Sequence, residues 1–231
     1  MATLCRSLSR LARVRLTRLD ECGAPDPGPT GTLVSSAYVN IDGSPQYLDP
    51  EEITQLNGNG EICISDQGTP QLRWVNLTMV ICQIDPDAVN IITGNPLVVD
   101  DAVAPNTVGF RLDGSLTGTA NFALEVWVGI PGQPCDAEGN REYGYFLFPY
   151  VKQARLGDWS FANAAVNLTL TARTEIDSGW GTGPAAYLVR RDAVSDAPEV
   201  LLTAITDDTH MHYEVVTVAP PAAACGAVAL A

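Results

Sequence analysis

Short segments that alternate apolar and polar side chains recur along almost the whole chain. In the clearest of them, residues 166–174, every second residue is apolar and the residues between are Asn, Thr or Arg. Clusters of Gly, Pro, Asn and Asp separate nearly all of these segments, and this pattern predicts an all-β sandwich or barrel. We expect strands from about residue 12 and over residues 31–41, 72–84, 121–130, 143–151, 166–174, 185–191, 200–206 and 212–219.

The expected strands differ in whether one or both of their faces should be buried. Residues 121–130 and 143–151 are apolar on both faces, so we expect both faces of these strands to be covered. Residues 72–84 instead alternate, which predicts one buried face and one polar face. The buried face would carry Val75, Leu77, Met79 and Ile81.

One short helix is expected to interrupt the strands, in the segment DPDAVNIITGNP. Asp85 can cap its first turn, and Pro86 suits the first helical position. Gly94 can end the helix in a left-handed conformation, and Pro96 prevents it from continuing. We therefore predict a helix of about two turns beside the sheet. The side chains expected to face the sheet are Val89, Ile92 and Ala88.

The chain has 231 residues and a formal net charge of −14, and this charge is unevenly distributed. Residues 1–20 contain five Arg and one Asp, so they sum to +4 and the remainder to −18. An acidic body repels phosphate, so we expect no nucleic acid on its outside. The length suits one β domain over residues 1–219 that begins with a basic arm, residues 1–12. A transit peptide is the alternative interpretation of that arm.

Neither a membrane span nor a secretory signal is expected. No apolar run approaches the roughly 18–20 residues that a membrane-spanning helix needs. The N-terminal segment lacks the continuous apolar core of a signal peptide. We therefore expect no membrane partner.

Three segments do not fit the strand pattern. Residues 42–62 separate two expected strands by about twenty residues, which indicates a functional or partner-bound extension. Residues 98–120 are rich in small, polar and turn-forming residues. Residues 220–231 form a low-complexity C-terminal tail, expected to be extended or disordered unless something binds it.

The glycine-rich stretch 179–184, GWGTGP, raises the question of a phosphate site. It lacks the Lys-Ser/Thr of a P-loop and the spacing of a dinucleotide fingerprint, and Pro184 removes a backbone N–H donor. We interpret it as a turn that joins the strands expected at 166–174 and 185–191. Trp180 would cover an apolar edge there.

No pattern of residues indicates catalysis, so we expect no catalytic residue and no bound cofactor. His210 and His212, with Asp207 and Asp208 nearby, could form a weak metal site, but surface or interface residues explain them better. The six cysteines have no metal-binding or redox spacing, so we expect reduced thiols and no metal. Secretion with disulfides is the alternative, and only then would the sequons at Asn76 and Asn167 matter.

Six segments in order resemble the major tail (tail tube) proteins of long-tailed phages of actinobacteria. They read RLTRLDECG, DPDAVNIITG, NFALEVWVG followed by a Cys, YGYFLFPYV, LGDWSF and TARTEIDSGWGTGP. The resemblance runs from about residue 12 to residue 219. The chain departs from the family pattern at Ala172, where a Gly is expected, and in SLSRLAR, which is longer than expected.

The resemblance implies a β-sandwich with one flanking helix, assembled as hexameric rings that stack into a hollow tail tube. It implies further partners (tape measure, tail terminator and tail tip proteins), assembly in the host cytoplasm, a location in the virion tail and no active site. A long loop in this family reaches the neighbouring ring, and residues 42–72 occupy its place. The expected inter-ring residues are Tyr47, Leu48, Glu51, Glu52 and Leu56, and the basic arm is expected to contact an acidic neighbouring subunit through Arg6, Arg10, Arg13 and Arg15.

A tube that conducts genomic DNA should not bind it tightly, so an acidic inner wall is expected to repel phosphates during ejection. Head-to-tail contacts make closed rings in one direction and open filaments in another. Another virion protein, a capsid decoration or head–tail joining protein, is the main alternative. The second is a secreted carbohydrate-binding β-sandwich with Trp127, Trp159 or Trp180 as its sugar platform.

Overall fold

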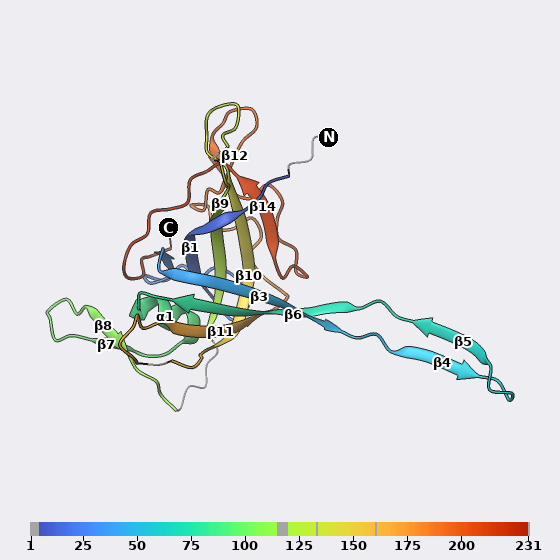
Figure 1. Ribbon diagram of the computed structural model, residues 1–231. Helices are drawn as coiled ribbons and strands as arrows, with labels where there is room; N and C mark the ends of the chain where they lie inside the picture. Colours follow the sequence, from blue (N-terminus) through green and yellow to red (C-terminus); the bar gives the residue numbers. More distant parts are fainter. Residues whose placement is uncertain (1–4, 115–119, 133, 160, 231) are drawn as a thin grey trace.

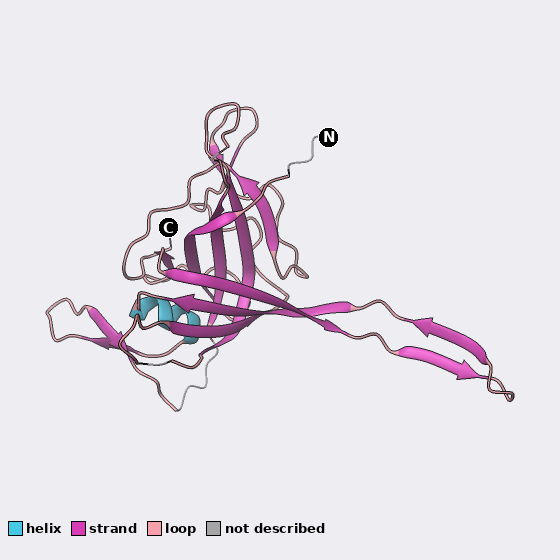
Figure 2. Cartoon of the chain, in the orientation of Figure 1, coloured by secondary structure: helices cyan, strands magenta, loops and turns pink. Residues whose placement is uncertain are grey.

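A computed structural model of the chain describes residues 5–114, 120–132, 134–159 and 161–230. Within these residues the protein consists of antiparallel strands and a single short helix, so the all-β prediction is confirmed (Figures 1 and 2). No helix in the described ranges is long and apolar enough to cross a membrane. Parts of the predicted basic arm (residues 1–4), of the segment 98–120 (residues 115–119) and of the C-terminal tail (residue 231) lie outside the described residues.

The elements follow one another along the chain with the helix between the sixth and seventh strands. They are β1 (Ser9–Leu19), β2 (Thr32–Ser35), β3 (Tyr38–Leu48), β4 (Glu52–Leu56), β5 (Ile62–Gln67), β6 (Gln71–Ile81), α1 (Pro86–Thr93), β7 (Leu97–Val99), β8 (Thr107–Phe110), β9 (Asn121–Gly129), β10 (Tyr143–Leu156), β11 (Leu168–Thr174), β12 (Arg190–Arg191), β13 (Pro198–Glu199) and β14 (His212–Val216).

The main sheet has the order β2-β1-β9-β10-β11-β6-β3, with β14 also paired to β10. The first half of β10 lies between β9 and β14, and its second half pairs with β11. The register shifts between Lys152 and Arg155, where Gln153 adopts a φ of 53°. The sheet changes direction at this bulge, so β9 and β10 cross the direction of β3, β6 and β11 in Figure 2.

The predicted strand over residues 31–41 is two strands in the structure. β2 and β3 are separated only by Ser36 and Ala37, yet they lie at opposite ends of the sheet order. The sheet must therefore curl until its two ends approach one another. This curling encloses a first core with residues from both halves of the sheet, including Leu16, Leu77 and Leu124.

Helix α1 closes one side of this first core. As predicted, Asp85 caps the helix by accepting a hydrogen bond from Asp87 N, and Gly94 ends it with a φ of 75°. The faces predicted for the helix and for β6 are also confirmed. The residues buried there are Ala88, Val89, Ile92, Val75, Leu77, Met79 and Ile81.

A second core lies on the opposite face of β1, β9 and β10, which explains why β9 and β10 are apolar on both faces. Irregular chain from residues 175–211 covers it. Of the strand predicted over 185–191 only its end, β12, is a strand, and it pairs with β13, which precedes 200–206; the strand predicted over 200–206 is wrong. The apolar residues in these segments pack against the sheet and do not mark paired strands. They are Tyr187, Val189, Leu201 and Ile205.

The glycine-rich stretch is a turn at the edge of the second core. Gly181 and Gly183 have φ values of 58° and 87°, and Gly183 N donates to Trp180 O over 2.8 Å. Trp180 is buried, as the turn interpretation requires. The turn leads into irregular chain and not directly into the predicted strand.

A buried ion pair joins the first strand to the middle of the sheet. Arg15 on β1 donates two hydrogen bonds to the carboxylate of its neighbour Glu125 on β9. Tyr145 Oη donates to Glu125 Oε1 over 2.7 Å, and the Arg15 guanidinium lies 3.3 Å from the Tyr187 ring centroid. Although burial opposes the charged form, the carboxylate of Glu125 raises the pKa of Arg15 above its ordinary value.

The C-terminal tail is extended and docked on its own chain. Val228 exchanges two backbone hydrogen bonds with Thr32 on the outer edge of β2, at 2.8 and 3.0 Å. Gly226 N donates to Asp85 Oδ2 and Ala227 N to Asp87 Oδ2, at 2.8 and 2.9 Å. The tail therefore belongs to the domain and is not separate from it.

Replacing Glu125 with Gln should lower the free energy of unfolding by about 3–5 kcal/mol, because it leaves the buried Arg15 without a counter-charge. Urea denaturation followed by circular dichroism measures this change. The control, D113N, removes the exposed pair between Asp113 and Arg111 and should cost about 0–1 kcal/mol. Equal losses in the two variants would contradict a special role for the buried pair.

Candidate assembly surfaces

A long two-stranded arm projects from the body of the protein (Figure 1). The strands β3 and β6 pair as far as Leu48 and Gln71, and β4 and β5 continue the hairpin beyond them. Residues 42–62 were expected to be an extension without the strand pattern. In the structure they belong to an ordered hairpin. A signal was present, because Asn57-Gly-Asn-Gly60 is a hairpin turn sequence and Gly60 has a φ of 84°.

The arm exposes large apolar side chains along most of its length. All five expected inter-ring residues lie on it and are exposed, and Tyr47 is 60% exposed. The sequence interpretation missed four more exposed large apolar residues of the arm: Ile53, Ile62, Ile64 and Leu72. A two-stranded hairpin is at best marginally stable alone in water, so these side chains indicate a surface that needs a partner.

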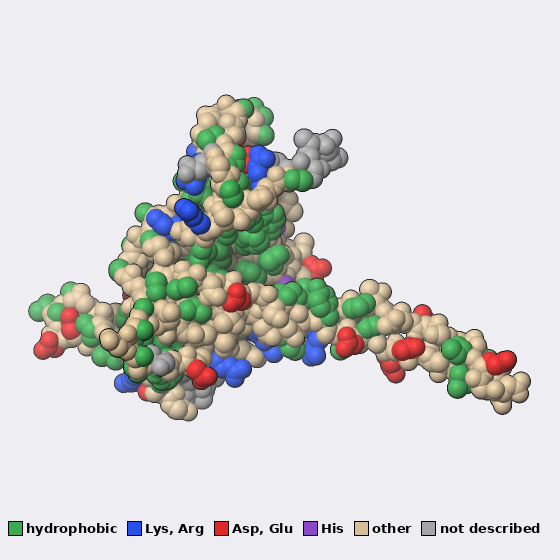
Figure 3. Space-filling view, viewed as in Figure 1, with side chains coloured by type: hydrophobic (Ala, Val, Ile, Leu, Met, Phe, Trp, Pro, Cys, Tyr) green, Lys and Arg blue, Asp and Glu red, His purple; other side chains and the backbone are tan. Residues whose placement is uncertain are grey.

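The arm is also acidic. Residues 46–72 contain five carboxylates and no Lys or Arg, so their formal charge is −5. Figure 3 shows red acidic and green apolar side chains alternating along it. The carboxylates are Asp49, Glu51, Glu52, Glu61 and Asp66.

The predicted basic arm is corrected by the structure. Arg15 lies in the interior with 7% exposure, so it cannot contact a neighbouring subunit. Arg6 is exposed but forms an ion pair with Glu142 of its own chain. Arg10 and Arg13 are accessible without an ion-pair partner among the described residues, and with Arg141 they line a groove of about 560 Å³.

Two open edges lie in the half of the main sheet formed by β3, β6, β11 and the end of β10, and the outer edge of β14 is also unpaired within the described residues. In the described part of the chain no strand pairs with the outer edge of β3. On β10, pairing with β9 ends at Val151, so no described strand lies beside residues 152–156 on that side. Open edges of this kind are templates for pairing with another chain.

The half-sheet formed by β3, β6, β11 and the end of β10 has one polar, uncovered face. Its other face packs on the first core through residues such as Leu77, Met79 and Leu170. A groove of about 440 Å³ runs over the uncovered face. Its polar lining residues include Gln46, Asn76, Thr78, Gln153, Arg155, Thr171 and Arg173.

The two histidines have different environments. His210 is buried and its Nδ1 lies 2.8 Å from Thr174 Oγ1, which accepts the backbone N–H of Val75. His212 pairs with Glu214. The expectation that both are surface or interface residues is wrong for His210, which is buried within its own chain. No group of three or more metal-ligating side chains gathers within the described residues.

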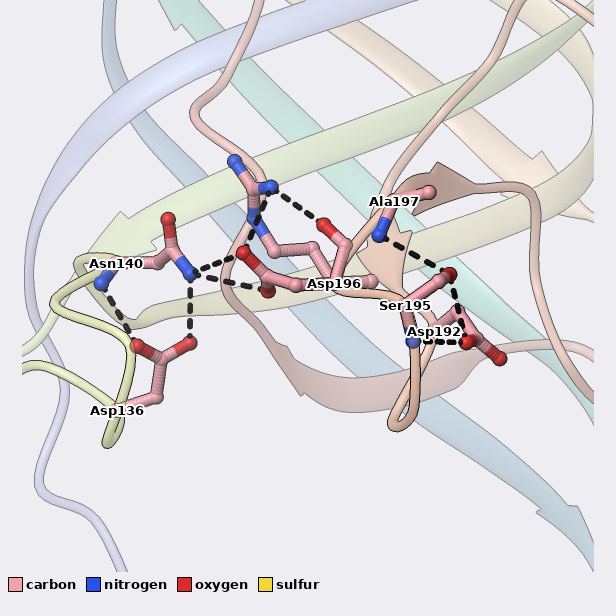
Figure 4. A network of polar contacts seen from close by, with 7 residues as sticks. Asp136, Asn140, Asp192, Ser195, Asp196 and Ala197 are labelled. Atoms are coloured by element: carbon pink, nitrogen blue, oxygen red, sulfur yellow. Dashed lines mark hydrogen bonds and ion pairs between the residues drawn. The ribbon is translucent and has the colours of Figure 1, made fainter.

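Other carboxylates hold loops together. Asp136 accepts hydrogen bonds from the backbone and side chain of Asn140, and Asn140 Nδ2 also donates to Asp196 (Figure 4). Hydrogen bonds from the backbone and side chain of Ser195 lower the pKa of Asp192. These side chains stabilise turns, and none of them lines either groove described above.

The remaining sequence expectations concern cysteine and tryptophan. Five of the six cysteines are free and exposed: Cys5, Cys22, Cys63, Cys82 and Cys225. Trp127 and Trp180 are buried, so neither can form a sugar platform, whereas Trp159 is exposed. The carbohydrate-binding alternative therefore loses two of its three tryptophans.

No model of a protein family matches the chain, and no curated protein matches it significantly. The surfaces are therefore interpreted from their geometry and from the resemblance of the sequence segments.

The buried His210 should make the protein less stable in mild acid. Burial lowers the pKa of His210, against the opposing effect of Glu175 and Asp208. The folded state favours the neutral imidazole. The free energy of unfolding should therefore be highest above about pH 6.5, the ordinary His pKa, and should fall as the pH drops below that value. Urea denaturation from pH 8 to pH 5 measures this loss. H210Q should lose less stability over this range than the wild type, and H212Q should behave like the wild type; an unchanged profile for H210Q would contradict the assignment.

Proposed function

We propose that the protein is the subunit of a phage tail tube, a structural virion protein without enzymatic activity. The observation that carries this proposal is the projecting arm, acidic and apolar, on a domain with two open sheet edges. The order of the sequence segments supports it independently.

The open edges are suited to ring formation. Successive strands from β10 through β11 and β6 to β3 are antiparallel, so β10 runs antiparallel to β3. The open edge of β10 in one copy can therefore pair with the β3 edge of the next and continue the alternation. This contact is heterologous, and it closes into a ring if the rotation between copies closes.

Ring closure also decides which face lines the bore. The first core, α1 and the other half of the sheet all lie on one face of the half-sheet. The bulk of each subunit must then lie outside the ring, and the uncovered polar face inside. Six copies per ring is the number that the family resemblance implies.

The arm would connect successive rings. It extends the line of β3 and β6 beyond the body, so it reaches past its own ring when these strands line the bore (Figure 1). Burial of its apolar side chains on the next ring would provide the stacking energy. Tubes would assemble in the host cytoplasm with tape measure, terminator and tip proteins, and become part of the virion tail.

A capsid decoration protein or a head–tail joining protein is the second candidate. The exposed arm suits these functions as well, because both proteins also bind other virion subunits. Two complementary open edges favour the tube, since a decoration protein needs no self-continuing sheet. Negative-stain electron microscopy of the purified protein tests the proposal: rings or tubes support it, and a monomer at every concentration and ionic strength contradicts it.

Replacing residues 49–70 by Asn-Gly should leave a folded subunit that no longer stacks. Leu48 and Gln71 are register partners, so a two-residue turn can join them. The removed residues are almost all exposed, so the free energy of unfolding should change by less than about 1 kcal/mol. Circular dichroism, urea denaturation and microscopy measure fold and stacking, and tubes of normal length from this variant would rule out the arm as the inter-ring contact.

Two matched double variants test whether stacking depends on the apolar residues of the arm or on exposed apolar residues in general. L56S/I62S removes an exposed cross-strand apolar pair of the arm. V103S/V194S removes two exposed apolar residues outside it. We expect shorter or absent tubes from the first variant only, by sedimentation and microscopy.

A further inference from the structure

The uncovered face of the half-sheet carries an unusual charge for this protein. Arg173 and Lys152 are register partners on β11 and β10, and Arg155 pairs with Thr171 beside them. Arg73 on β6 reaches this group through its side chain, because its guanidinium and that of Arg173 both contact the Trp74 ring. Figure 3 shows Lys and Arg side chains along the lower side of the body, whereas the arm carries acidic ones.

Few carboxylates oppose these cations. Asp42, the register partner of Thr78, and Glu175, which lies 3.6 Å from Arg173, are the acidic groups beside them. Four cations against two carboxylates leave a local charge of +2 in a chain whose net charge is −14. The expected acidic lining is therefore not what this face provides.

The cations are arranged with their hydrogen-bonding groups available. The guanidinium carbons of Arg73 and Arg173 lie 4.3 and 5.0 Å from the Trp74 ring centroid, so the indole holds both groups at the surface. Arg73 and Arg155 are exposed and form no ion pair within the described ranges, whereas Arg173 is paired with Glu175. Amide and hydroxyl groups line the same groove: Gln46, Asn76, Thr78, Gln153 and Thr171.

We propose that this face is a contact surface for the phosphate backbone of duplex DNA. Arg, Lys, Asn, Gln and Thr side chains make most of the phosphate contacts in protein–DNA complexes, and none of them needs to read a base. Three or four contacts give weak, salt-sensitive and sequence-independent binding, which permits sliding. The inference rests on the proposed function for its location, because ring closure places this face in the bore.

The acidic arm of a second copy is the competing occupant, and the groove suits it less well. The arm needs an apolar surface for Tyr47, Ile53 and Ile62, all of which are exposed. The apolar lining of the groove is limited to Trp74, Leu77 and Ala172, of which the last two are already buried in the core. DNA phosphates require only the polar and cationic groups that the face offers.

Fluorescence anisotropy with a labelled 20-base-pair duplex at low salt tests the proposal. The unassembled subunit should bind the duplex with an affinity that falls as salt rises, and R155Q/R173Q should bind at least tenfold more weakly. The slope of log affinity against log salt should fall by about 1.8, because each lost phosphate contact removes about 0.9. R155Q alone, at an exposed position, should lower the slope by about 0.9 without disturbing the fold.

The matched control, R10Q/R13Q, removes the same charge from the other Arg-lined groove and should leave DNA binding unchanged. Absence of binding by the wild type, or loss of binding in R10Q/R13Q instead, would overturn the proposal. Loss of tubes in R155Q/R173Q with no DNA binding by the wild type would assign the groove to the neighbouring arm. If the wild type forms no tubes yet binds DNA through Arg155 and Arg173, the tube function fails while the ligand of this face stands.

Discussion

A strand has only two edges for hydrogen bonding, and β10 divides its two edges among three neighbours. β9 occupies one edge as far as Val151, while β14 and then β11 share the other. The bulge at Gln153 separates the two environments and redirects the sheet. From this division follow the two halves of the sheet, the two cores on opposite faces, and the unpaired edge beyond Val151. The proposed ring contact therefore originates in the same strand that organises the interior.

The two cores are not equivalent in chemistry. The first is formed by aliphatic and aromatic side chains around α1, whereas the second contains the pair of Arg15 and Glu125 with the hydroxyl of Tyr145. Removing either partner of this pair would leave the other as an uncompensated buried charge beneath the irregular chain. The covering segment can lack regular strands for this reason: Tyr187 packs on the guanidinium and its hydroxyl lies 2.8 Å from both Thr17 and Thr32.

The sequence predicted what local chemistry determines. The capping residues Asp85 and Gly94 located the helix, and alternation located the buried face of β6. The sequence interpretation failed where an interaction partner lies far along the chain. Arg13 and Arg15 occupy equivalent places in the alternation, and only the pairing of Arg15 with Glu125 makes their environments differ. The strands β4 and β5 of the arm were not predicted, because a hairpin without a buried face shows no apolar period. Of the candidate surface, the arm was located from the resemblance and its length, whereas the open edges and the charge of the bare face required the sheet topology.

The docked C-terminal segment links the beginning and the end of the chain. Val228 occupies the β2 edge, and Asp85 and Asp87 fix the preceding two residues while also serving the helix start. The edge strand is thereby shielded by the protein itself. Without this pairing the outer edge of β2 would be a further open edge, of the kind that pairs with other chains, so residues 226–228 act on their own sheet as an edge cover.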